Sequence, residues 1–250
     1  MNDWLDDLVT AVAFLTRLPM PHPTGPMPAN FVRAHRMFPL VGAAIGGAVG
    51  IAFLAMRAIG VPDLAAAALA LGASAILTGA LHEDGLADVA DGFGGGRDTA
   101  AKLEIMRDSR LGTYGALILM VSFVTKVSAI AVLPDATVVQ SLIAAHALAR
   151  GVLPVMSMSL AYARKDGLAA NAGRPDLPTA GIAGAFALVI ALLTLPWIEA
   201  LCAGLVAVIS ATGMAWLAQW QIGGQTGDVL GGAEQLGETA ILVLLAARLA

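Results

Sequence analysis

Long apolar runs, separated by short polar connections, restrict the fold of this chain more than any other feature of its sequence. Of its 250 residues, 58% are hydrophobic and 13% are charged. Soluble domains carry about 25% charged residues, so this composition does not suit a soluble core. Runs of about 20 apolar residues are long enough to cross a bilayer as helices. The sequence therefore predicts an all-α, polytopic transmembrane bundle that forms one integral membrane domain over residues 1–250.

About seven spans are expected, with six as the alternative. The alanine and glycine content of the runs suits close helix packing, because small residues let backbones approach each other. The last run is the least typical, since Glu234 and Glu238 lie in its first half. The runs are residues 37–59, 63–81, 113–133, 137–161, 179–197, 201–221 and 228–250.

The first 20 residues have the pattern of an amphipathic helix that lies in the membrane interface. Trp4, Leu8 and Leu15 fall near one helical face, while Asp3 and Asp7 keep the rest of the surface polar. These acidic residues stand where a secretory signal peptide has basic ones, so no cleaved leader is expected.

The basic residues predict how the bundle is oriented. Ten of the 14 Lys and Arg residues lie before the first span, between spans two and three, and between spans four and five. The positive-inside rule places those segments in the cytoplasm. Two segments expected to form the site lie on the same side. They are residues 82–112, expected to be an active-site loop, and residues 221–238. We therefore expect a multi-pass inner-membrane protein whose site faces the cytoplasm.

The segment HEDGLADVADGFGGG, residues 82–96, places acidic side chains directly after an apolar run. If the helix continues into this segment, Asp84, Asp88 and Asp91 stand at i, i+4 and i+7 and share one face. Clustered carboxylate oxygens suit Mg²⁺ or Mn²⁺. The alternative is a solvated acidic helix end. The residues predicted to hold magnesium are Asp84, Asp88, Asp91 and, from the second segment, Asp228.

A glycine-rich stretch and a basic segment follow the acidic residues. Gly94 and Gly95 permit a backbone turn and the close approach of a ligand. In KLEIMRDSRLGTYG, residues 102–115, Arg110 beside Asp108 can hold a phosphate through two hydrogen bonds. The alternative for these basic residues is the positive-inside bias alone.

Two further cations, Lys126 and Arg150, lie inside predicted spans, where a charge costs about 2.5–3.5 kcal/mol on insertion scales. They are functional candidates, and structural pairing with a carboxylate is the alternative. His146 is expected to be a core histidine, and Glu238 either joins the site or begins a helix. The predicted substrate-binding residues are Gly94, Gly95, Arg107, Asp108, Arg110, Lys126 and Arg150.

Metal-bound carboxylates beside phosphate-binding cations point to phosphoryl or nucleotidyl-type transfer. The metal would neutralise a diphosphate, and one carboxylate would take the proton of an attacking hydroxyl. Glu83 points about 100° away from the carboxylate stripe. The sequence holds no Walker motif, no Ser-His-Asp arrangement and no Cys/His zinc spacing.

Three blocks, LHEDGLADVADGFGGG, IMRDSRLGTYG and GGQTGDVLGG, resemble the signature motifs of the cobalamin synthase family, the adenosylcobinamide-GDP ribazoletransferases. AVAFLTRLP and FPLVGAAIG extend the resemblance, and LGG in the last block stands where LGA is usual. The resemblance implies a membrane enzyme that joins adenosylcobinamide-GDP to α-ribazole or its 5′-phosphate, uses Mg²⁺ and releases GMP. Its partners would be these small molecules and the membrane, with no nucleic acid and an open oligomeric state.

The acidic block also resembles a variant of the CDP-alcohol phosphotransferase motif. That analogy implies Asp91 as the catalytic base, with Asp228 and Glu83 as the other candidates. Membership of that second family is disfavoured, because Asp88 and Val89 stand where its motif has Ala-Arg. A cation-coupled transporter is also less favoured, since its acidic residues would be expected nearer the membrane midplane.

Overall fold

The computed structural model describes residues 3–20, 30–164 and 173–250. Over these residues the chain is helical, and its one bridge of β type joins Tyr162 to Gln225. The elements are α1 (Asp3–Leu15), α2 (Phe31–Ala34), η1 (His35–Met37), α3 (Phe38–Ala58), α4 (Asp63–Thr78), α5 (Leu81–Gly95), α6 (Thr99–Ile105), α7 (Thr113–Val132), α8 (Val138–Gly151), α9 (Leu153–Ser159), α11 (Leu177–Thr194), α12 (Trp197–Ile222) and α13 (Gly227–Leu249).

Six helical segments of the described residues are long and apolar enough to cross a membrane. A bent pair, α4 followed by α5, makes a seventh if it counts as one span. The prediction of an all-α bundle with six or seven spans is therefore confirmed. The six segments are Phe31–Ala58, Thr113–Val132, Val138–Ser159, Leu177–Thr194, Trp197–Ile222 and Gly227–Leu249.

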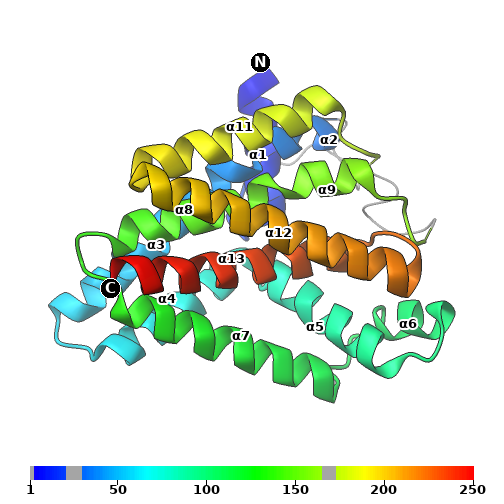
Figure 1. The fold of residues 1–250 in the computed structure, drawn as a ribbon, viewed down its shortest axis with the longest axis horizontal. Helices are drawn as coiled ribbons and strands as arrows, with labels where there is room; N and C mark the ends of the chain where they lie inside the picture. The colour runs from blue at the N-terminus through cyan, green and yellow to red at the C-terminus, as the bar shows by residue number, and fades with distance from the viewer. Residues whose placement is uncertain (1–2, 21–29, 165–172) are drawn as a thin grey trace.

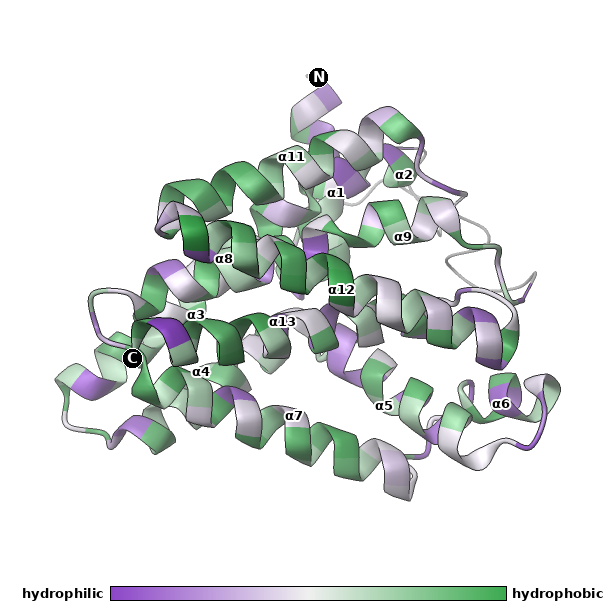
Figure 2. Cartoon of the chain, in the orientation of Figure 1, coloured by the Kyte–Doolittle hydropathy of each residue, from purple (hydrophilic) through white to green (hydrophobic). Residues whose placement is uncertain are grey.

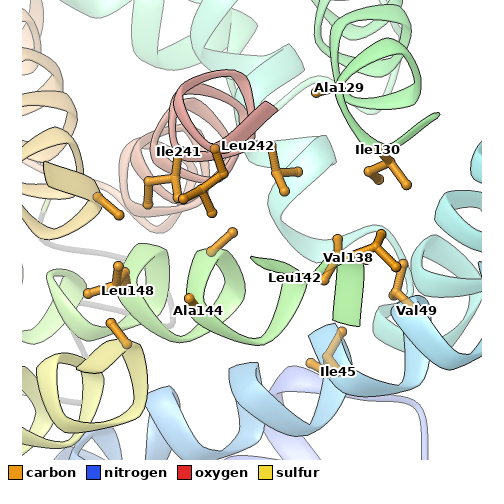
Figure 3. Packing of buried hydrophobic residues seen from close by; sticks show 14 of the residues in the cluster. Ile45, Val49, Ala129, Ile130, Val138, Leu142, Ala144, Leu148, Ile241 and Leu242 are labelled. Atoms are coloured by element: carbon orange, nitrogen blue, oxygen red, sulfur yellow. The ribbon is translucent and has the colours of Figure 1, made fainter. Parts of the chain in front are cut away.

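α8 and α13 form the centre of the bundle. α8 packs on α3, α11 and α13, and α13 packs on α5, α7 and α12. Contact between α3 and α8 is close because Gly42 and Gly46 leave no room for a Cβ against the backbone of α8. The core residues between these helices form one buried cluster (Figure 3), which includes Ile45, Val49, Leu142, Leu148, Ile241 and Leu242.

The outward faces of α7 and α12 carry large apolar side chains. Met120 and Val124 of α7 and Leu205 of α12 are exposed, and Figure 2 shows these faces as largely hydrophobic. An apolar surface of this extent suits contact with lipid. Trp197 at the start of α12 and Trp220 near its end are also exposed. Membrane proteins concentrate tryptophan at the two interfaces, so this placement suits a helix that spans the bilayer.

The bend between α4 and α5 directs the acidic segment away from the axis of α4. The two helices meet at 92°. Gly79 and Ala80 both adopt left-handed backbone angles, with φ of 67° and 54°. Such an angle is uncommon for alanine, so the run expected to continue to residue 81 ends at Thr78 instead. The N-terminal segment braces this bend, since the backbone N–H of Arg17 donates to Leu77 O at 2.7 Å.

The N-terminal amphipathic helix is present as α1, but one of its acidic residues is not on a polar surface. Asp7 is fully buried and pairs with Arg33 and Arg36 at 2.9 and 2.8 Å. The expectation that Asp7 lies on the polar surface of the helix was wrong. The two arginines, which lie much later in the sequence, pair with its carboxylate inside the protein. The position of α1 in the membrane interface stays a prediction.

Figure 1 shows how the connections are distributed between the ends of the bundle. The turn from α12 to α13 lies at the same end as the turn from α5 to α6. The turns from α7 to α8 and from α11 to α12 lie at the opposite end, with the C-terminus. This arrangement brings the two segments expected to form the site to one end.

Candidate active site

A close crossing of α5 and α13 builds the candidate site. A Cβ added at Gly85 would lie 2.8 Å from the backbone oxygen of Asp228 and 3.2 Å from Cα of Gly231. Asp84 precedes Gly85 directly and Asp88 follows it by about one turn of α5, so this crossing brings both carboxylates near Asp228 at the start of α13. The expectation that the two acidic segments meet is confirmed.

The electrostatics of Asp88 reflect this crowding. Asp88 lies on α5, outside the six long spans, and its pKa is raised to about 7. Partial burial is the largest cause, followed by the charges of Asp84, Asp228 and Asp91. Because crowded carboxylates suit a hard divalent cation, the residues present fit the magnesium ion that the family resemblance implies.

Asp228 is held by two donors on the same oxygen. Its Oδ2 accepts a hydrogen bond from Thr226 Oγ1 at 3.1 Å and one from Arg164 Nη2 at 3.2 Å. Thr226 also caps α13, since its hydroxyl accepts the N–H of Val229 at 3.2 Å. The helix start therefore fixes the carboxylate that faces α5.

Asp91 binds the N-terminus of α7. Its Oδ2 accepts the backbone N–H of Gly112 at 2.7 Å, and its Oδ1 accepts that of Gly115 at 2.8 Å. Neither glycine could carry a Cβ without a collision with this carboxylate. A carboxylate at a helix N-terminus is stabilised by free N–H groups and by the helix dipole. Asp91 therefore docks α5 onto α7, and its roles as base and metal ligand stay predictions.

The segment predicted as a loop over residues 82–112 contains two helices, α5 and α6. Gly94 and Gly95 lie in the last turn of α5, and the chain leaves the helix after them. A Cβ at Gly94 would lie 2.7 Å from the ring of Tyr114, and one at Gly95 would lie 3.4 Å from Ile105. These glycines thus let α6 and α7 pack against α5, which differs from the expected turn. Their contact with substrate stays a prediction.

The basic residues after α6 lie on the connection that leads into α7. Arg110 has a side chain that is 87% exposed, and its Nε donates to both oxygens of Asp108 at 3.0 Å. This pairing lowers the pKa of Asp108. Arg107 is exposed on the same connection. The three residues therefore lie near the α7 start that Asp91 caps, and their binding of substrate stays a prediction.

Lys126 and Arg150 lie in a buried ionic network at the centre of the bundle. Lys126 Nζ donates to Gln235 at 2.7 Å and to Glu238 at 3.1 Å. Arg150 pairs with Glu234 at 2.6 Å. In this arrangement both cations are neutralised by α13, as the structural alternative anticipated, and their predicted contact with substrate stays a prediction. The other members of the network are His82 and His146.

One group in this network has the spacing of a metal site. The ligand atoms of His146, Glu234 and Glu238 lie within 4.8 Å of one another, which holds for no other group of three such side chains among the described residues. Lys126 and Arg150 already neutralise its two carboxylates, so the group is better described as a structural ion cluster. The charge of Glu83 acts on Lys126 and Glu234, so Glu83 lies within electrostatic range of this network.

Arg164 is the residue of the site that sequence reasoning missed. It was counted only among the basic residues that set the orientation, yet it pairs with Asp228. Its position depends on backbone pairing between residues 161–163 and Gln225, which has no local sequence signature. Its position in a basic connection did not distinguish it from the other basic residues there.

A family model described as cobalamin-5-phosphate synthase matches residues 7–246. Three curated relatives are each named adenosylcobinamide-GDP ribazoletransferase. The one from a Sinorhizobium species is 41% identical over 257 residues, which cover 98% of this chain and 98% of the relative. The one from Bradyrhizobium diazoefficiens is 42% identical over 242 residues, which cover 96% and 93%.

The third relative, from Mesorhizobium japonicum, is 43% identical over 241 residues, which cover 96% of this chain and 92% of the relative. No solved structure is significantly similar to this chain. The match extends from α1 to the last turns of α13, so it includes both acidic segments and the helices that bring them together. The chain therefore belongs to the cobalamin-5-phosphate synthase family, and it is a membrane transferase of cobalamin biosynthesis.

Proposed function

We propose that this chain joins adenosylcobinamide-GDP to α-ribazole or α-ribazole 5′-phosphate and releases GMP. The observation that carries the proposal is the crossing of α5 and α13, which gathers Asp84, Asp88 and Asp228 beside Arg164. The names of the curated relatives supply the first substrate and the type of transfer. The basic residues support a site at the cytoplasmic face of the inner membrane.

The reaction proposed is a substitution at phosphorus. A ribose hydroxyl of α-ribazole attacks the phosphorus that is joined to cobinamide. A new P–O bond forms, the bond from this phosphorus to the bridging oxygen breaks, and GMP leaves with that oxygen. The hydroxyl proton passes to a carboxylate of the site. A ribose hydroxyl is a poor nucleophile near neutral pH, so the base and the stabilisation of charge on phosphorus are the chemistry that the protein must supply.

Asp84, Asp88 and Asp228 are proposed to hold Mg²⁺, which when bound would neutralise diphosphate charge. Asp91 is proposed as the base. Two hydrogen bonds from backbone N–H groups fix this carboxylate at the start of α7. A carboxylate has about four lone-pair sites, so Asp91 can still accept a proton. Asp228 and Glu83 are the alternatives, and Glu83 is the less favoured of the two because its charge acts on Lys126 of the buried network.

The test is an assay of the detergent-solubilised protein. Wild-type protein with adenosylcobinamide-GDP, α-ribazole and Mg²⁺ should release GMP and form a product with the mass of the joined molecule. Removal of the cation with EDTA should stop both. Release of CMP from a CDP-alcohol substrate, with no release of GMP, would instead favour a phospholipid enzyme. Uptake by proteoliposomes without either reaction would favour a transporter.

A further inference from the structure

Arg164 lies beside the carboxylates of the candidate site and has hydrogen-bond donors that these carboxylates do not use. Its Nη2 lies 3.2 Å from Asp228 Oδ2, and its charge also acts on Asp88. The side chain is only 19% exposed. Its Nη1 is buried and has no hydrogen-bond partner among the described residues. A guanidinium carries five N–H donors, and a buried donor without an acceptor costs free energy. An anionic oxygen in the site would supply that acceptor.

The position of Arg164 is fixed by the backbone on its N-terminal side. Ala163 N–H donates to Gln225 O at 2.9 Å, and Gln225 N–H donates to Ala161 O at 2.7 Å. The turn that precedes α13 fits closely here, since a Cβ at Gly224 would collide with the carbonyl of Ala161. The same turn leads directly into Asp228, so one piece of backbone places both the cation and its carboxylate partner.

The side chain of Gln225 completes this attachment. Its Nε2 donates to Ser157 O at 2.7 Å and to Leu160 O at 3.0 Å, which are carbonyls at the end of α9. Gln225 is itself buried. The connection that carries Arg164 is therefore attached to the start of α13 by backbone and side-chain bonds. A basic residue that served only to orient the protein in the membrane would not need this attachment.

We propose that Arg164 binds the phosphate that is transferred, an inference that rests on the proposed function. In the arrangement described here the guanidinium pairs with Asp228. When the cation and the diphosphate are bound, Asp228 would be a ligand of the cation, and Arg164 would be free to donate to the non-bridging oxygens of the phosphate joined to cobinamide. Planar guanidinium groups suit this contact because they offer paired donors to phosphate. The donor stabilises the charge on phosphorus while the bond to GMP breaks.

The competing view is that Arg164 only neutralises Asp228. The two views differ in what a substitution should do. If Arg164 only neutralised Asp228, its loss would change the affinity for the cation but not turnover at saturating cation. If it binds phosphate, its loss lowers turnover at saturating cation and weakens binding of a diphosphate. Affinity for the cation alone should be kept or increased, because a positive charge has left the carboxylates.

The experiment compares Arg164→Gln and Arg164→Lys with Arg97→Gln in the full-length protein in detergent. Arg97 is an exposed cation on the segment after α5, so its substitution makes the same change in net charge. Three quantities are measured for each protein: Mn²⁺ affinity by electron paramagnetic resonance, affinity for GDP in the presence of Mn²⁺, and kcat for release of GMP at saturating Mg²⁺.

Arg164→Gln should lower kcat by about 10²–10³-fold, as loss of a donor to a transition-state oxygen does. It should weaken GDP binding and leave Mn²⁺ affinity equal to or above that of wild type. Arg164→Lys should fall between wild type and Arg164→Gln, because a point charge replaces the planar fork.

A kcat for Arg164→Gln that matches Arg97→Gln overturns the proposal. So does a loss of Mn²⁺ binding in both Arg164 variants, which would make Arg164 a support of the carboxylates. If wild type releases no GMP, the proposed function fails instead. The GDP measurement then still decides whether Arg164 binds phosphate.

Discussion

Among single residues, Asp88 should make the cation affinity of the site depend on pH. Its pKa of about 7 means that a proton and a cation compete for this carboxylate near neutral pH. The protonated form dominates below that pKa, so affinity for Mn²⁺ should fall as pH falls through 7. The slope should approach about tenfold per pH unit for one competing proton. Titrations of the wild-type protein from about pH 8.5 to about pH 5.5 measure it.

Asp88→Asn should remove both the binding and this pH dependence, together with Mg²⁺-dependent release of GMP. Asp63→Asn is the matched control, because Asp63 is an exposed carboxylate at the start of α4 that pairs with Arg57. The control should bind Mn²⁺ as wild type does. An Asp88→Asn protein with wild-type Mn²⁺ affinity and activity would remove Asp88 from the metal site.

Asp91 requires a test that separates catalysis from helix docking, because both of its oxygens accept backbone N–H groups of α7. As a base, Asp91→Asn should lower kcat by about 10²–10⁴-fold and leave Mn²⁺ and adenosylcobinamide-GDP binding nearly intact. The amide keeps one acceptor oxygen, so part of the docking survives. Steady-state kinetics and thermal unfolding of the same preparation measure the two effects.

Asp98→Asn is the control for Asp91, since Asp98 caps α6 by accepting the N–H of Ala101 at 2.9 Å. Asparagine is as good a cap as aspartate, so this variant should resemble wild type. If Asp91→Asn lowers the melting temperature but keeps its kcat, Asp91 only joins α5 to α7. Loss of Mn²⁺ binding would instead make it a ligand.

At the scale of helices, the crossing of α5 and α13 determines whether the carboxylates meet. A Cβ at Gly85 would lie 2.8 Å from Asp228 O, so Gly85→Ala must push the two helices apart. Overpacking of this kind typically costs about 1–3 kcal/mol. The variant should lose Mn²⁺ affinity and activity as well as thermal stability. Gly72→Ala in α4 is the control, because a Cβ there meets no atom within 4 Å.

The buried ionic network makes a second prediction at this scale. Glu234→Gln leaves the Arg150 guanidinium with reduced charge compensation inside the bundle. Loss of one partner of a buried pair costs about 3–5 kcal/mol. The melting temperature should therefore fall well below that of Glu199→Gln, which breaks the exposed pair with Arg248. A stable Glu234→Gln protein with a raised KM for adenosylcobinamide-GDP would instead support a role of Arg150 in substrate binding.

Local pattern and loop charge predicted much of this arrangement, for physical reasons. The i, i+4, i+7 stripe of Asp84, Asp88 and Asp91 follows from helical geometry alone. The nearness of Asp228 followed from the number of spans between the two acidic segments. The bend at Ala80 was not predictable, since nothing in its side chain favours a left-handed angle.

Long-range partners were the other features that local pattern could not supply. The pairing that positions Arg164 joins the backbone groups of Ala161 and Ala163 to those of Gln225, and any sequence can make such bonds. Lys126 and Arg150 were recognised as costly charges, but their shared partners on α13 depend on helix packing. The sequence therefore indicated that these cations need acidic partners, but it could not identify the partner residues.

For the whole molecule, the arrangement of the turns makes a prediction about sidedness. Ser109 precedes α7 at the end of the bundle that holds the site, and Asp135 follows α7 at the opposite end. Since α7 is long enough to cross the bilayer, single cysteines at these positions should be labelled from opposite sides. Both residues are exposed. A Cys202→Ala background removes the single native thiol.

Intact spheroplasts and inverted membrane vesicles, treated with a membrane-impermeant maleimide, provide the measurement. The positive-inside bias predicts that Ser109→Cys reacts only in inverted vesicles and Asp135→Cys only in spheroplasts. Labelling of both positions from one side would mean that α7 does not cross the membrane, and the reversed pattern would place the carboxylates outside the cytoplasm.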